Sequence, residues 1–166
     1  MRMPYHIVIS LVISGIVYLL LRSIAGALAC FIAGVFIDLD HLFDYFLNIG
    51  PPVRVKHFFW TFKYDVLNNI IVFFHAWEWI LIIFVILWLI DWNPVAVGLF
   101  FGVCSHLLLD EIFNDHQPLA YFLTYRVFHR FSARHFYSKY EYEKRLKNTK
   151  KTCVTEYDRT ENNRNT

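Results

Sequence analysis

The stretch Ile37-Asp38-Leu39-Asp40-His41 marks the point where an apolar run gives way to ionisable residues. Residues 24–37 are nearly all apolar or small, and two carboxylates and an imidazole follow within four positions. On a helix, Asp38 and His41 are three positions apart and share a face. Because each ionisable group costs about 3 kcal/mol in a bilayer, such a cluster beside a membrane helix indicates a function. The alternative is that these residues simply end a helix in solvent.

The composition separates this chain from ordinary soluble domains. Its 166 residues are 57% hydrophobic and 18% charged, which is more apolar than a soluble domain of this size. A net charge of +2 says little about partners, and no specific nucleic-acid partner is inferred. Cys30, Cys104 and Cys153 form no Cys-x-x-Cys pair, so neither a disulfide framework nor a cysteine zinc site is predicted.

Four apolar segments approach the length of about 20 residues that a membrane-spanning helix needs. They cover residues 5–21, 24–47, 66–90 and 95–113, and Pro94 is well placed at the start of the last. The first segment resembles a signal peptide, but Arg22 interrupts it and more apolar chain follows, so we read it as an uncleaved helix. The predicted fold is an all-α integral membrane bundle of four transmembrane helices.

The remaining segments are predicted to lie on or outside the membrane. Residues 53–65 are basic and aromatic and favour a short interfacial helix, and residues 119–142 favour a helix lying on the membrane. From Lys144 onwards the chain has no apolar period, which predicts a disordered basic tail. The expected divisions are a four-helix metal-site domain, an interfacial amphipathic segment and a polar tail, at residues 1–116, 117–142 and 143–166 respectively.

The distribution of basic residues predicts the orientation. With four spans, the N-terminus, the loop over residues 48–65 and the C-terminal tail lie on one side, and every Lys and Arg except Arg22 lies there. Because cytoplasmic loops are enriched in Lys and Arg, both termini are predicted to be cytoplasmic. Membrane lipid is the expected partner, with anionic lipid headgroups at the basic tail.

The ionisable residues of the four segments share one depth, in the predicted cytoplasmic half: His6, then Asp38, Asp40 and His41, then His75 and Glu78, then His106 and Asp110. Buried histidines with unrelated packing roles would have no reason to share a depth. Rows of small or polar residues at four-residue steps lead to several of them and indicate inward faces. These rows are Gly98-Gly102-His106-Asp110, Gly26-Cys30-Gly34-Asp38 and His6-Ser10-Ser14.

Imidazole and carboxylate side chains together suit a transition metal, with zinc expected first and manganese or iron as alternatives. The predicted ligands are His6, Asp38, His41, His75, His106 and Asp110. Asp40 and Glu78 are the predicted catalytic residues, either orienting ligands or acting as general base. This number of groups suits one or two ions. One ion activates a bound water, and two can clamp both oxygens of a phosphoester displacement.

The same elements resemble a bacterial family, the membrane-bound metal-dependent hydrolases of the inner membrane. They are the early His6, the stretch Asp38-Leu39-Asp40-His41, the central His75 and the spacing His106-x-x-x-Asp110. They occur in this order over about residues 1–115. The Thr-His-Ser triplet and the His-Arg pair that are often found near the central His in this family are missing. The resemblance implies an inner-membrane location and metal-dependent hydrolysis at the cytoplasmic face. A lipid-borne phosphoester is the favoured substrate class.

Three other functions stay open at this stage. A four-helix haem protein could draw two axial ligands from the histidines, although haem needs no carboxylate ligands. A small metal or proton carrier could use the same residues, but it needs polar groups through the full thickness of the membrane. A purely structural membrane protein leaves the shared depth unexplained.

Overall fold

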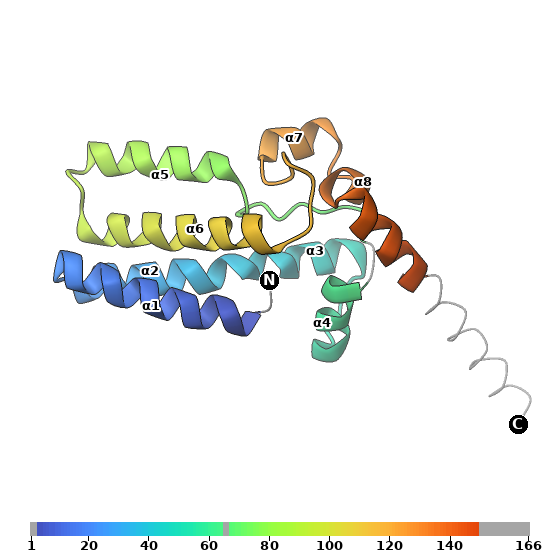
Figure 1. Ribbon diagram of the computed structural model, residues 1–166, viewed down its shortest axis with the longest axis horizontal. Coiled ribbons are helices and arrows are strands. Elements are labelled where there is room, and N and C mark those ends of the chain that lie inside the picture. The colour runs from blue at the N-terminus through green and yellow to red at the C-terminus, as the bar shows by residue number, and fades with distance from the viewer. Residues whose placement is uncertain (1–2, 65–66, 150–166) are drawn as a thin grey trace, which may run out of the picture.

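The computed structural model describes residues 3–64 and 67–149, and they form an all-α protein. Four helices lie side by side and alternate in direction (Figure 1). They are α1 (Met3–Leu21), α2 (Ile24–Phe36), α5 (Trp77–Leu89) and α6 (Pro94–Phe113). The shorter helices gather at the end of this bundle where α2 and α6 finish (Figure 1). The predicted all-α class is confirmed.

Side-chain caps determine where α2 and α6 begin. The Ser23 hydroxyl accepts a hydrogen bond from the Gly26 amide at 3.2 Å. The Asn93 side chain accepts one from the Val95 amide at 2.9 Å, with Pro94 in the first turn. Both caps satisfy amides that have no partner inside their helix. The chain can therefore reverse sharply before each helix.

Small residues bring α2 and α6 into backbone contact. Gly26, Gly34, Gly98 and Gly102 are all buried, and α2 packs more extensively against α6 than against any other described element. A Cβ added at Gly98 would overlap the Gly26 carbonyl oxygen. On α1, His6, Ser10 and Ser14 are also buried. The predicted inward rows are thus confirmed for the glycines and for α1.

The helix predicted over residues 24–47 is broken at residues 37–39. A 3₁₀ turn, η1 (Ile37–Leu39), separates α2 from α3 (Asp40–Asn48). Asp38 lies in the turn, while Asp40 begins α3. Asp38 lies near Nε2 of His75 and Asp40 lies near Nδ1 of the same ring, so the two carboxylates contact different nitrogens of His75.

The predicted helix over residues 66–90 is wrong in its first part. Residues 67–76 form no helix, and α5 begins only at Trp77. Val72 has a φ of 33°, a value that a β-branched residue rarely adopts. Periodicity alone could not separate this buried apolar segment from a helix. We call residues 67–76 the His75 loop.

The chain around the bundle end is made of short elements. The helix predicted over residues 53–65 is confirmed as α4 (Val55–Tyr64), and its place on a membrane surface stays a prediction. The single helix predicted over residues 119–142 is wrong, because α7 (Leu123–Phe128) and α8 (Ala133–Phe136) are separated by turns with positive φ at Arg130 and Phe131. A further helix covers residues 139–149, so the prediction of a disordered tail is wrong over residues 144–149. The rest of the predicted tail, residues 150–166, lies outside the described residues.

Two helical segments, Ile24–Asn48 and Pro94–Phe113, are long and apolar enough to cross a membrane. Two more apolar segments, Tyr5–Leu21 and Trp77–Leu89, are shorter. At 1.5 Å per residue, α5 extends about 20 Å, against a hydrocarbon core of about 30 Å. Exposed large apolar side chains are frequent on all four long helices, for example Leu20, Leu81 and Leu99.

Candidate metal centre

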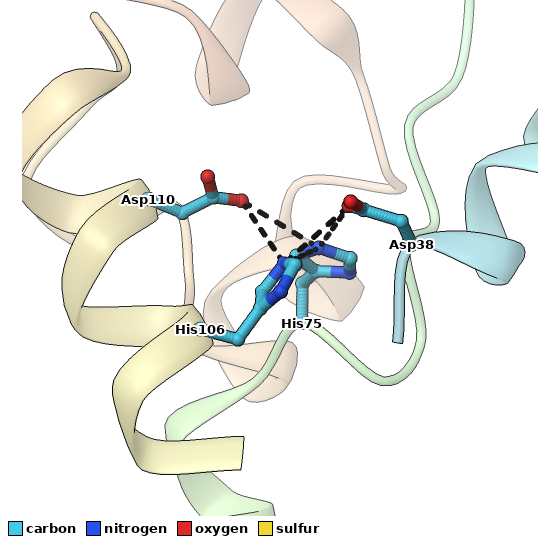
Figure 2. A group of neighbouring side chains, drawn as sticks. All are labelled: Asp38, His75, His106 and Asp110. Atoms are coloured by element: carbon cyan, nitrogen blue, oxygen red, sulfur yellow. Dashed lines mark hydrogen bonds and ion pairs between the residues drawn. The ribbon is translucent and has the colours of Figure 1, made fainter. Parts of the chain in front are cut away.

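Asp38, His75, His106 and Asp110 meet at the end of the bundle, and we call them the His/Asp cluster (Figure 2). Asp38 comes from η1, His75 from the loop before α5, and the other two from α6. Asp38 Oδ1 lies 3.4 Å from Nε2 of both histidines. Asp110 Oδ2 lies 3.6 Å from the same two nitrogens, which are 3.1 Å apart. The cluster could hold a metal ion.

The far nitrogens of both rings are held by acceptors behind the cluster. His106 Nδ1 lies 2.9 Å from the Gly34 carbonyl oxygen. Since a carbonyl only accepts, Nδ1 carries the proton and Nε2 presents its lone pair to the cluster. His75 Nδ1 lies 3.0 Å from Asp40 Oδ1 in the same way. A carboxylate behind an imidazole is a common support of metal-binding histidines.

Asp110 has partners of its own. His6 Nε2 lies 3.1 Å from Asp110 Oδ1, whereas Oδ2 is the oxygen near His75 and His106. The His6 ring stacks on His106 at 4.3 Å. The Tyr121 hydroxyl donates to Asp110 Oδ2 at 3.5 Å. Burial and the negative charge of Asp110 raise the pKa of the Tyr121 phenol well above its ordinary value, so it stays a donor. His6 therefore supports Asp110 and does not belong to the four-residue group.

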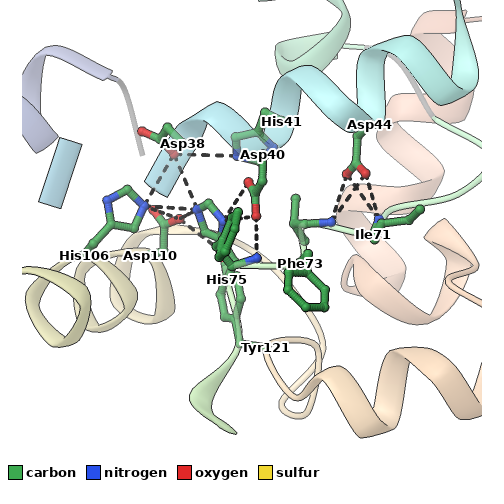
Figure 3. A network of polar contacts seen from close by, with 12 residues as sticks. Asp38, Asp40, His41, Asp44, Ile71, Phe73, His75, His106, Asp110 and Tyr121 are labelled. Carbon is green, nitrogen blue, oxygen red and sulfur yellow. Dashed lines mark hydrogen bonds and ion pairs between the residues drawn. The ribbon is translucent and has the colours of Figure 1, made fainter. Parts of the chain in front are cut away.

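The His75 loop is held by charged groups, and Figure 3 shows the carboxylates among them. The Asp44 carboxylate accepts hydrogen bonds from the Ile71 and Val72 amides at 3.0–3.4 Å. The buried Arg126 guanidinium donates to the carbonyls of Ile71, Val72 and His75. Sequence reasoning missed Arg126, because nothing separates it from the other basic residues of its segment. These contacts hold the loop and thereby position the His75 ring.

The electrostatic environment of His75 favours positive charge. Burial alone would lower the pKa of His75, but the carboxylates of Asp40 and Asp38 outweigh it and raise this pKa to about 10. These carboxylates therefore favour the charged form of the ring. A divalent ion between the same carboxylates would replace one form of positive charge with another.

Four of the residues predicted from sequence lie outside the cluster: His6, Asp40, His41 and Glu78. His41 Nε2 is 3.7 Å from Asp38 Oδ1, and the half-exposed ring borders His75 at 5.0 Å. With Asp40 and His75, it forms a second group that could hold an ion. Glu78 does not join either group. Its carboxylate accepts hydrogen bonds from the Leu123 and Thr124 amides, both at 3.0 Å, at the start of α7.

A pocket of about 560 Å³ opens beside the cluster. Asp38, His41 and His75 line one part of it. The described residues around it include no Ser, Thr or Cys, and the hydroxyl groups among them are the phenols of Tyr121 and Tyr137. Asp40 is not among the lining residues, since its carboxylate faces His75 and the Phe74 amide.

No protein-family model, curated protein or solved structure matches this chain.

Proposed function

We propose that the His/Asp cluster binds a divalent transition metal and that the chain is a membrane-bound hydrolase. Its proposed substrate is a phosphoester, and lipid-borne phosphoesters belong to this substrate class. The spacing of the four ligand atoms carries this proposal. In a tetrahedral site with bonds of about 2.0–2.1 Å, neighbouring ligand atoms lie about 3.3 Å apart. The five separations between histidine nitrogens and carboxylate oxygens, or between the two nitrogens, are 3.1–3.6 Å.

The chemistry of the donor set agrees with this geometry. Two carboxylates balance the charge of a divalent ion, and two neutral imidazoles favour zinc, with manganese or iron as alternatives. His41 and Asp40 leave room in the proposal for a second ion. Closed sites with four protein ligands are usually structural. Here Asp38 and His75 line a pocket, which leaves one side of the cluster accessible to a further ligand.

The proposed reaction uses water as the nucleophile. A bound ion would lower the pKa of a water molecule towards 7 and stabilise charge on phosphoryl oxygens. His41 lies at the pocket edge beside Asp38, where an imidazole can accept and return a proton. Asp40 keeps the His75 ring in place, and His6 and Tyr121 do the same for Asp110. Glu78 has no part in this reaction.

The membrane setting belongs to the same proposal. In it, α1, α2 with α3, α5 and α6 all cross the inner membrane of a bacterium, with both termini on the cytoplasmic side. Exposed apolar side chains on these helices support this arrangement. The short α5 would be accommodated by local thinning of the bilayer. The cluster then lies near the cytoplasmic face.

The haem alternative conflicts with the geometry. A haem iron holds its two axial imidazoles on opposite faces of the macrocycle, whereas the Nε2 atoms of His75 and His106 are only 3.1 Å apart. His6 stacks on His106, which also leaves no space for a porphyrin between those rings.

Elemental analysis and a hydrolysis assay test the proposal together. We expect the purified protein to carry about one zinc, manganese or iron ion per chain, and to cleave p-nitrophenyl phosphate esters or phospholipids in vesicles. Chelation should abolish cleavage, and the metal should restore it. Protein without a stoichiometric transition metal would rule out the metal centre, and metal-loaded protein inactive on every phosphoester would rule out the reaction.

The support of His75 gives a second prediction. Asp40→Asn keeps the shape of the side chain but removes the charge behind His75, and loss of such an outer contact typically weakens metal binding about 10–100-fold. Glu78→Gln is the matched control, since it makes the same chemical change at a carboxylate outside the cluster. We expect it to leave metal affinity unchanged. Competition with a chromogenic chelator measures both, and equal losses would contradict the assigned role of Asp40.

A further inference from the structure

The pocket beside the cluster has two chemically different parts. Asp38, His41 and His75 form its polar end. More than half of the other lining residues are aromatic: Phe58, Phe59 and Phe62 from α4, Phe113 from α6, and Tyr121, Phe136 and Tyr137. The rest are Val72 and the polar residues Asn114, Asp115, His116, Glu141 and Arg145. Metal-dependent hydrolysis does not itself require seven aromatic side chains around the approach to its ion. A ligand that fits this pocket therefore has a polar end and an apolar end.

Contacts of Arg145 join the two sides of the aromatic part. Arg145 from the helix over residues 139–149 donates to the Phe62 carbonyl at 3.0 Å and to Glu141 at 2.9 Å. Its guanidinium also lies over the Tyr137 ring at 4.4 Å. This helix is thereby fastened to α4 across the pocket. The pocket volume of about 560 Å³ lies in the range of small-molecule sites, roughly 300–1,000 Å³.

The rim of the pocket is apolar and accessible. Phe59 is 49% exposed and Phe113 is 61% exposed, although both line the pocket. Ile112 next to Phe113 is exposed as well. Exposed apolar groups that continue a pocket wall indicate a route for an apolar ligand. In Figure 1, α4 runs across the direction of the long helices at the bundle end, as a helix lying in the membrane surface would.

We propose that the aromatic part of this pocket is a binding subsite for the aliphatic chain of the substrate. The aliphatic chain of the substrate lies between α4, the end of α6 and residues 136–145. Its polar head then lies at the His/Asp cluster. The inference rests on the proposed function for the nature of that head, a phosphoester. Such a subsite selects amphiphiles over water-soluble phosphoesters. The aliphatic chain enters it from the lipid, past Phe59 and Phe113.

Chain length is the measurable variable. Burial of one methylene group strengthens binding up to about fourfold, so affinity for ethyl, butyl, hexyl and octyl phosphate should climb steeply, by up to about 15-fold for each two-carbon step. Isothermal titration of metal-loaded protein in amphipol measures this, with the polymer alone as the blank. Metal-free protein titrated with butanol, hexanol and octanol measures the aliphatic subsite without the metal or any turnover.

Phe59→Ser is the test variant, because this half-exposed residue forms one wall and has little to do with the core. We expect about 5–10-fold weaker binding of octyl phosphate and octanol, with ethyl phosphate and the metal content unchanged. Val55→Ser is the matched control: it removes an exposed apolar group from α4 outside the pocket, and it should change nothing.

The outcomes separate this inference from the proposed function. Chain-dependent binding of alcohols that Phe59→Ser weakens supports the subsite, even if no phosphate ester is bound or cleaved, which would overturn only the hydrolase. Phosphate esters that bind equally at every chain length overturn the subsite and leave the hydrolase standing. Equal losses in Phe59→Ser and Val55→Ser also overturn the subsite.

Discussion

Asp38→Ala is expected to weaken metal binding by about 10²–10³-fold and to abolish hydrolysis. Structural zinc sites with four ligands bind with about 10–16 kcal/mol, so each ligand contributes about 3–4 kcal/mol on average. Asp38 Oδ1 contacts Nε2 of both cluster histidines at 3.4 Å, and its loss leaves Asp110 as the single cluster carboxylate. The side chain is 13% exposed at the pocket, so its truncation leaves only a small cavity and the protein should still fold.

Asp115→Ala is the matched control for this substitution. Asp115 lines the same pocket but lies outside the His/Asp cluster, so both variants remove one carboxylate and change the net charge equally. We expect Asp115→Ala to keep wild-type metal affinity. Chelator competition on both proteins, with thermal unfolding of the metal-free forms, separates lost ligation from lost structure. Wild-type affinity in Asp38→Ala would show that the ion, if bound, lies elsewhere.

The part of the site that the sequence reveals is the part carried by helices. His106 and Asp110 are visible because ionisable residues are rare in an apolar helix, and their spacing places them on one face of α6. The same reasoning grouped His6 and His41 with the ligands. Depth and facing say which groups approach one another, but they do not say which group contacts the ion and which supports a ligand. That order depends on distances of about 3 Å, which no periodicity encodes.

The His75 loop shows a different limit. Of its apolar residues, Leu67, Ile70, Val72 and Ala76 are buried in the protein. This apolar run would equally suit a membrane helix. The non-helical conformation depends on amide and carbonyl groups that find partners in Asp44 and Arg126, and these lie far away in the sequence. A buried segment can leave the helical state only where such partners exist. The sequence contains both residues, but nothing in it pairs them with this loop.

Gly98→Ala is expected to destabilise the bundle and to weaken the metal centre with it. The new Cβ would overlap the Gly26 carbonyl oxygen and lie 2.8 Å from its carbon. Both are backbone atoms, so no side chain can rotate away. Overpacking commonly costs 1–3 kcal/mol, and we expect about 3 kcal/mol here. For a chain of this length that lowers the unfolding midpoint by about 6–12 °C.

The same substitution at Gly15 should stabilise the protein, whereas the one at Gly98 destabilises it. Gly15 lies in α1, and a Cβ there would meet nothing within 4 Å, so Gly15→Ala should stabilise its helix by up to about 1 kcal/mol. Gly98→Ala also pushes α6 away from α2, and so moves His106 and Asp110 relative to Asp38. Its metal affinity should therefore fall, while that of Gly15→Ala stays unchanged. If Gly98→Ala unfolded at the wild-type temperature, the two helices would not be in backbone contact, and the geometry proposed for the metal centre would lose its support.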